Sequence, residues 1–228
     1  MTRITLDTIG DRGTEPSSRG RRISSSGPRR GAPAERVPRA FLLSPAHCDG
    51  KRARLLMRAE ASFDLARRLR DGGAPLGEVF SHLSGLYFRG KLAYSLAFAT
   101  AARGIMIITP TDGLVPPETV VTVDDLRRYA SVAIAAGDER YRQPLTHDCE
   151  RLLARVGRQA EVVLLGSLAT RKYLDVLEPM FGPRLRLPRE FVGRGDMSRG
   201  ALLLRAVREG RELEYMPVPS AIPPRHRR

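Results

Sequence analysis

Residues 44–52 bring together side chains that can act as nucleophile, base and anion ligand. An apolar run ends there, and the loop then carries an imidazole, a thiol, a carboxylate and two cations (His47, Cys48, Asp49, Lys51 and Arg52). Neighbouring cations lower the pKa of a thiol, so Cys48 is a candidate nucleophile; the alternative is a small side chain packed beside a turn. Cations at a helix start oppose the helix dipole, which favours a bound anion. We predict ligand or phosphate contacts at Ser44, His47, Lys51 and Arg52.

The segment 109–117 is rich in turn-forming residues and carries one carboxylate, Asp112. The Asp112-Gly113 pair can form an Asx turn, or the carboxylate can act as a base or contact a sugar or base edge. A reaction at an N-glycosidic bond needs charge stabilisation at the sugar, and Asp112 is the candidate for that role. Asp112 and Cys48 are therefore the two predicted catalytic residues, and Thr109 is a predicted ligand contact.

Two further segments place glycine next to small polar residues. Ser167, after Gly166, is expected to cap a helix, which is compatible with a ligand at the same helix start. The spacing Gly193-x-Gly195-x-x-Ser198-x-Gly200 is near that of dinucleotide loops, but the third glycine is misplaced, so a Rossmann fingerprint is rejected. We expect both segments to approach the ligand, through Gly166, Ser167, Arg194 and Ser198.

Residues 87–94 mix aromatic side chains with two cations, Arg89 and Lys91. Stacking and phosphate contact use such residues, whereas the plainer interpretation is the start of an amphipathic helix. We retain Arg89 and Lys91 as phosphate contacts. His82 and His147 have no ligand partners at helical spacing, and no H-E-x-x-H, P-loop or Gly-x-Ser-x-Gly motif occurs. The sequence therefore predicts neither a metal nor a cofactor.

The elements that position these residues are strands alternating with helices. Apolar runs predict strands at 40–44, 105–109, 161–165 and 184–187, with a last strand at 212–218. Apolar spacing predicts helices at 52–71, 87–103, 144–156 and 168–181, and Thr122-x-x-Asp125 predicts a capping box. This alternation predicts a three-layer α/β domain with a mostly parallel sheet and helices on both faces. Because ligands bind outside the carboxyl ends of such strands, we expect the loops that follow them to form one site.

Composition sets the limits of the domain. Of 228 residues, 42% are hydrophobic, and the formal net charge is +14, carried mostly by arginines. We expect residues 1–38 to be a disordered basic arm, 39–218 a single α/β domain and 219–228 a flexible basic tail. The basic surface favours nucleic acid or a nucleotide as partner. No apolar run is long enough to span a bilayer and no signal peptide is evident, so we expect a cytoplasmic protein without membrane contact.

Three of these segments together resemble a known but uncharacterised bacterial domain family. Residues 44–52, 86–94 and 108–116 match its Cys-x-x-Lys-Lys-like strand end, its Leu-Tyr…Phe-x-Lys helix and its Ser-Ala-x-x-Gly-Leu strand end. A similar domain accompanies archaeosine tRNA-modifying enzymes. Residues 162–174 are similar to the Leu-Gly-x-x-Ala-x-x-x-Leu element of the uracil-DNA glycosylase fold. The resemblance implies that fold and a DNA contact in the loop at 193–204, while the glycosylase water-activating loop and His-Pro-Ser segment are absent.

Three functions are compatible with these patterns. The leading hypothesis is a protein directed at nucleic acid or a nucleobase, which flips a base into the strand-edge pocket and acts on an N-glycosidic bond or a modified base. The second is a small-molecule enzyme that uses a free nucleotide or another anionic metabolite. The third is a non-catalytic module that binds such a ligand.

Overall fold

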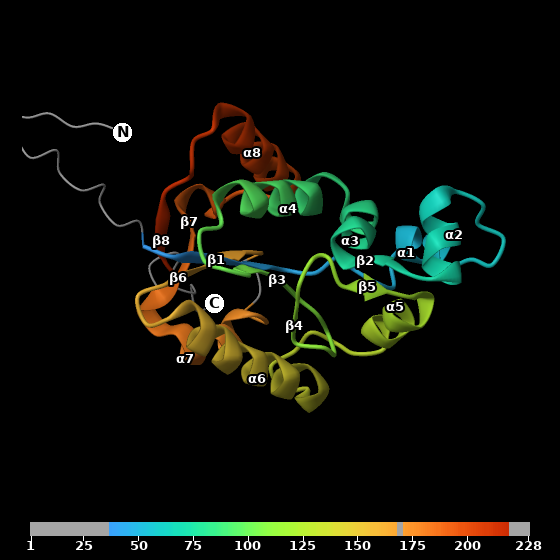
Figure 1. Ribbon diagram of the computed structural model, residues 1–228, viewed down its shortest axis with the longest axis horizontal. Coiled ribbons are helices and arrows are strands. Elements are labelled where there is room, and N and C mark those ends of the chain that lie inside the picture. Colours follow the sequence, from blue (N-terminus) through green and yellow to red (C-terminus); the bar gives the residue numbers. More distant parts are fainter. Residues whose placement is uncertain (1–36, 168–170, 219–228) are drawn as a thin grey trace, which may run out of the picture. The chain divides into compact units, whose positions relative to one another are not determined.

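Four apolar segments form adjacent parallel strands of one sheet (Figure 1). β1 (Arg39–Leu43) lies between β3 (Ile105–Ile108) and β6 (Glu161–Leu165), and β6 pairs with β7 (Leu185–Pro188). The computed structural model describes residues 37–167 and 171–218, all of them within one compact unit. Most of the predicted arm, the predicted tail and residues 168–170 lie outside the described residues. The strand positions agree with the sequence prediction because each strand is buried on both faces and reads as a continuous apolar run.

Short antiparallel strands extend the sheet at both edges. β4 (Leu114–Val115) pairs with β3, and β8 (Tyr215–Pro217) pairs with β7, which gives the order β4-β3-β1-β6-β7-β8. The prediction of a mostly parallel sheet is confirmed. β4 was not predicted, because it consists of two residues inside a segment dominated by turn formers. A separate ribbon pairs β2 (Ala74–Pro75) with β5 (Val120–Val121).

Helices cover both faces of the sheet, as predicted. α4 (Leu86–Phe98) and α8 (Asp196–Glu209) pack against each other on one face, and α6 (Glu139–Val156) and α7 (Leu174–Phe181) lie on the other (Figure 1). Two 3-10 turns flank β7, at Gly182–Arg184 and Arg189–Phe191. The sheet and its helices therefore form the three layers that the alternation of elements predicts.

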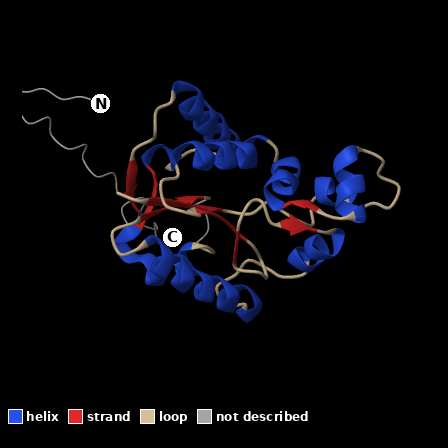
Figure 2. Cartoon of the chain, in the orientation of Figure 1, coloured by secondary structure: helices blue, strands red, loops and turns tan. Residues whose placement is uncertain are grey.

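The remaining helices gather around the small ribbon, beyond the end of the main sheet (Figure 2). They are α1 (Lys51–Leu56), α2 (Asp64–Asp71), α3 (Leu76–Ser84) and α5 (Val123–Ala130). The continuous helix predicted at 52–71 is wrong, since α1 ends at Leu56 and α2 starts at Asp64. The loop between α1 and α2 is held by the Arg70 guanidinium, which donates to the carbonyls of Arg58 and Ala61. These two carbonyls therefore have hydrogen-bond partners although they lie outside a helix.

Three other helix boundaries differ from prediction. α4 stops at Phe98 because the amides of Thr100 and Ala101 donate to the Arg39 carbonyl of β1. α6 begins before the expected Pro144, at Glu139, where the Asp138 side chain accepts from the Arg140 amide. Because proline is common in the first turn of a helix, the helix was predicted to start at Pro144, which instead lies inside α6. α7 begins at Leu174, so Ser167 does not cap it. The predicted capping box at Thr122 and Asp125 is confirmed.

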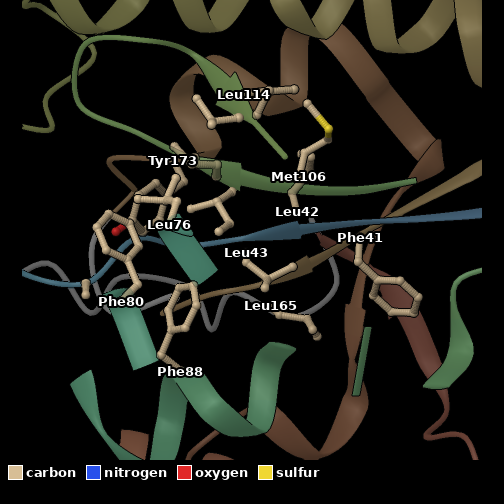
Figure 3. Close-up of a cluster of buried hydrophobic side chains, with 14 of the residues drawn as sticks. Phe41, Leu42, Leu43, Leu76, Phe80, Phe88, Met106, Leu114, Leu165 and Tyr173 are labelled. Atoms are coloured by element: carbon tan, nitrogen blue, oxygen red, sulfur yellow. The ribbon is translucent and has the colours of Figure 1, made fainter. Parts of the chain in front are cut away.

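One hydrophobic core joins the sheet to α3 and α4. The side chains of β1 alternate between the two faces: Leu42 points toward Met106, and Leu43 points toward Phe88, whose ring packs edge to face on Phe80 at 5.4 Å (Figure 3). Cys48 and Cys149 belong to this core and are both unpaired. In the described part of the chain, no helix has the length and apolar character needed to cross a bilayer.

Candidate functional site

A cavity of about 670 Å³ opens where the predicted loops meet. Each of the four segments singled out in the sequence contributes to its wall: Ser44 to Asp49 after β1, Pro110 after β3, Ser167 after β6 and Asp196 at the start of α8. Five predicted site residues line it, namely Ser44, His47, Cys48, Lys91 and Ser167. The topology explains the meeting, because β1, β3 and β6 are adjacent and parallel and so end at the same edge.

Lys91 is the most unusual residue of this wall. Its side chain is only 1% exposed, and its amino group donates to the carbonyl oxygen of Ser44 and, at 3.0 Å, to the Ser44 hydroxyl. The nitrogen also lies 4.6 and 4.7 Å from the ring centres of Tyr87 and Phe88. Burial lowers the pKa of Lys91 to about 7, against the opposing effect of the Asp196 carboxylate. The amine is therefore poised between its charged and neutral forms near neutral pH.

Two buried tyrosines flank this lysine. Tyr87 is 5% exposed, and its hydroxyl has no hydrogen-bond partner of good geometry within residues 37–167 and 171–218. Burial raises its pKa, and the nearby Arg199 guanidinium only partly opposes this. Burial likewise raises the pKa of Tyr173, whose hydroxyl is near enough to Ser44 for a hydrogen bond that lowers it. Both phenols are neutral proton donors at the cavity wall.

Cys48 lies in the cavity wall but is not activated. Its side chain is buried and its thiol makes a weak hydrogen bond to the Ala46 carbonyl at 3.7 Å. Burial raises the pKa of Cys48 to about 12, and the Asp49 carboxylate adds to the shift. The cations expected to lower this pKa do not do so: Lys51 is exposed at the start of α1, and the Arg52 guanidinium donates to the His82 carbonyl instead. His47 is exposed and pairs with Asp49.

Asp112 lies outside this cavity. Its carboxylate pairs with Arg128 at 2.7 Å, accepts from the Tyr129 hydroxyl at 2.9 Å and accepts from the Thr111 hydroxyl at 2.8 Å. The Thr109 hydroxyl accepts from the Asp112 amide and donates to the Gly113 carbonyl, which closes the turn. The turn alternative for this segment therefore describes its geometry, and Asp112 reaches the cavity only indirectly, through Tyr129.

Several predicted phosphate contacts do not line the cavity. Arg52 donates to the His82 carbonyl, and Arg194 bonds the hydroxyl of Ser198 at 3.1 Å on the exposed start of α8. Lys51 and Arg89 are exposed on α1 and α4. Gly166 brings the ends of β6 and β1 together, since an added Cβ there would lie 3.2 Å from the Ser44 Cβ.

The structure adds residues that the sequence patterns did not identify. Tyr129 and the segment 130–134 form one side of the cavity, and Lys172 with Tyr173 forms another. Tyr87 belongs to the segment 87–94, whose mixture of aromatic and basic residues is the sequence feature that could have identified it as a site residue. Tyr129 lies near the end of α5, and the remaining residues come from the connections after α5 and before α7, where no motif marks them and only the tertiary fold brings them to the strand edge.

A second cavity, of about 610 Å³, lies elsewhere between α4, β3 and the segment 116–118. Its wall includes Leu92, Leu96 and Ile105, with charged groups from Arg103 and Arg155. None of the predicted site residues lines it. Over the residues that the structure describes, no group of three or more histidine, cysteine or acidic side chains is arranged to hold a metal ion. The strand-edge cavity is therefore the candidate site.

Comparison with known proteins gives no match: no family model fits the chain, and no curated protein or solved structure is significantly similar to it.

Proposed function

We propose that the strand-edge cavity binds a nucleobase linked to a sugar phosphate, either as a free nucleotide or as a nucleotide turned out of a nucleic acid. The observation that carries the proposal is that one buried amine and three tyrosines share the wall of a cavity of suitable size. A volume of about 670 Å³ falls within the range typical of small-molecule sites. The finer assignment to a uracil-DNA-glycosylase-like fold is part of the same proposal, supported by loops that meet at one end of a parallel sheet.

The wall offers separate surfaces for the parts of such a ligand. Tyr87, Tyr129 and Tyr173 supply aromatic surface, and bases stack on aromatic side chains with about 1–3 kcal/mol per base. Val132 and Ile134 add apolar surface beside them. The hydroxyl of Ser44 and the amine of Lys91 supply the polar groups that orient a ring or a carbonyl.

A phosphate would meet amines rather than the predicted arginines. Lys172, partly buried with its nitrogen 5.1 Å from the Tyr173 ring centre, lines the cavity together with Lys91. Asp49 and Asp196 also line the wall; Asp196 pairs with Arg199, and the Asp49 carboxylate contacts the His47 ring. Lys91 and Lys172 are therefore the lysine amines of the wall that an anion could contact.

Calorimetric titration of the full chain tests the proposal. The ligands are the four ribonucleoside monophosphates, the matching nucleosides, inorganic phosphate and a short single-stranded oligonucleotide. We expect monophosphates to bind more tightly than nucleosides or phosphate alone. Lys91→Met should weaken this binding by about tenfold or more, which corresponds to loss of a charge-assisted hydrogen bond. Lys51→Met makes the same chemical change at an exposed amine outside the cavity and should leave the affinity within about twofold.

Competition with the oligonucleotide distinguishes a free nucleotide from a nucleotide within a nucleic acid, and other outcomes would contradict the proposal. Oligonucleotide binding that weakens steeply with salt, and that competes with monophosphates, indicates a nucleotide within a nucleic acid. Monophosphate binding without oligonucleotide competition indicates a free nucleotide. If none of the base-containing ligands binds, or if Lys51→Met and Lys91→Met have equal effects, the proposal is wrong.

A further inference from the structure

Two of the three lysines of this chain line the candidate site. Of 39 lysines and arginines, only Lys51, Lys91 and Lys172 are lysines. Lys91 and Lys172 line the strand-edge cavity, and Lys51 follows two residues after Asp49, which also lines it. Arginine cannot lose its proton in a protein and cannot act as an amine nucleophile, whereas lysine can do both. In so arginine-rich a chain, lysines gathered at one cavity indicate that the site uses amine chemistry.

Lys91 is held as a reactive amine rather than as a partner in an ion pair. Among the residues described, no carboxylate forms a salt bridge with it, and its hydrogen bonds go to the uncharged oxygens of Ser44. Asp196 of α8 is the acidic group that acts on it from a distance, and Tyr87 and Tyr173 are the titratable neighbours from α4 and the start of α7. A desolvated lysine without a counter-ion is the form that enzymes use as a nucleophile.

Proton donors stand beside the amine. The centre of the Tyr87 ring is 4.6 Å from the Lys91 nitrogen, and its buried hydroxyl makes no well-formed hydrogen bond to any other described residue. Tyr173 brings a second phenol to the same wall. Addition of an amine to a carbonyl gives a carbinolamine, whose hydroxyl group leaves only when a proton is delivered to it. The wall thus contains both the nucleophile and the acid for that reaction.

We propose that Lys91 forms an imine with an aldehyde or ketone ligand that enters the strand-edge cavity. In this step the Lys91 nitrogen attacks the carbonyl carbon, the nitrogen loses two protons, and the carbonyl oxygen leaves with those two protons as water while a carbon–nitrogen double bond forms. Water reverses the step and frees the ligand. The proposal rests on the proposed function for its ligand class, since the open-chain aldehyde of a pentose 5-phosphate is the sugar phosphate of a nucleotide without its base.

Reductive trapping tests this proposal with the lysines of the same chain as controls. The full chain is incubated at pH 7.5 with ribose 5-phosphate and cyanoborohydride, which reduces an imine to a stable secondary amine. Peptide mass spectrometry then measures the label at residues 51, 91 and 172 separately. We expect Lys91 to be labelled about tenfold faster than the exposed Lys51. The proposal is overturned if Lys91 stays unlabelled or is labelled no faster than Lys51.

A second set of measurements identifies the source of the carbonyl and the role of the phenol. An oligonucleotide with an abasic site carries the same sugar aldehyde, so comparison of the two probes separates a free sugar phosphate from one within a nucleic acid. Tyr87→Phe keeps the aromatic ring and removes the hydroxyl, and it should slow trapping by about tenfold and shift the pH profile of trapping. An unchanged trapping rate in Tyr87→Phe would show that Tyr87 is not the proton donor. Of the two phenols, Tyr173 would then hold that role.

The two proposals fail in different ways. If nucleotides bind in calorimetry but Lys91 is not trapped, the imine is wrong and the nucleotide site stands. If Lys91 is trapped selectively but nucleotides neither bind nor slow the trapping, the nucleotide assignment is wrong and the amine chemistry stands. Lys91→Arg keeps the positive charge and removes the reactive amine. Because the comparison of residues 51, 91 and 172 is made within the unmodified chain, it remains informative even if that variant does not fold.

Discussion

Gly90 of α4 lies directly against Gly200 of α8. This contact sets how closely α4, which carries Tyr87 and Lys91, packs against α8. A Cβ added to Gly90 would lie 2.8 Å from the Gly200 carbonyl oxygen, and one added to Gly200 would lie 2.9 Å from the Tyr87 Cα. Both obstacles are backbone atoms, which cannot rotate out of the way. The two helices can therefore pack this closely only if both positions lack a side chain.

Gly90→Ala should accordingly destabilise the protein by about 1–3 kcal/mol, because overpacking outweighs the gain of about 1 kcal/mol in helix propensity. Urea unfolding measures the change. Gly137→Ala, in the turn before α6, is the control for adding a methyl group without a clash, since no atom lies within 4 Å of an added Cβ there. The variant should also slow the trapping of Lys91. Equal stability of the two alanine variants would show that the α4–α8 contact is not limiting.

The buried amine of Lys91 should make stability depend on pH in the alkaline range. Its pKa falls from 10.5 in the unfolded chain to about 7 in the fold, so the unfolded state binds one more proton between these values. Stability therefore rises with pH between about 7 and 10.5, by about 1.4 kcal/mol per pH unit, and the penalty is fully present below pH 7. Lys91→Met should lack this rise in urea unfolding measured from pH 6 to 10. Parallel pH profiles for the wild type and Lys91→Met would contradict the assignment.

Cys48 should be slow to react in the folded protein. With a thiol pKa of about 12, only about 10⁻⁴ of it is ionised at pH 8. Cys149 is the internal control, since burial raises its pKa to about 12 as well. Iodoacetamide at pH 8 should modify both only after unfolding, as mass spectrometry of each peptide can show. Rapid native modification of Cys48 alone would restore it as a candidate nucleophile.

Asp112→Asn should act on stability more than on ligand binding. The substitution removes the charge that pairs with Arg128 and weakens the bond to Tyr129, which should cost about 1–2 kcal/mol in urea unfolding. Asp124→Asn is the control, because Asp124 forms a fully exposed pair with Arg127 on the same helix. Nucleotide affinity should change by less than about threefold. A loss of trapping or binding far beyond the loss of stability would indicate a direct role for Asp112.

The sequence predicted the strand-edge site better than its chemistry. Apolar runs identify β1, β3, β6 and β7 because buried parallel strands have no polar face, and their order along the chain then indicates one common edge. Burial of individual polar groups is not visible in a sequence. Lys91 and Arg89 look alike there, yet one is enclosed by α4, α8 and the end of β1 while the other is exposed.

The residues that the sequence missed share a physical cause. Tyr129 reaches the cavity from the end of α5, and Lys172 and Tyr173 reach it from the connection before α7, so their positions depend on how these two helices dock. Asp112 is a different case, since its local turn is encoded by Thr109 and Gly113 but its carboxylate pairs with Arg128 from a helix that follows later in the chain. A local turn can therefore be predicted from the sequence, whereas an ion pair between residues far apart in the chain cannot.

The two margins of the sheet are formed by short strands. β4 has two residues and β8 has three, and a proline follows the first and ends the second (Pro116 and Pro217). Brief, proline-terminated margins expose little backbone for a strand of another copy to pair with. The four longer apolar strands, β1, β3, β6 and β7, therefore occupy the interior of the sheet, and its two margins are formed by its shortest strands.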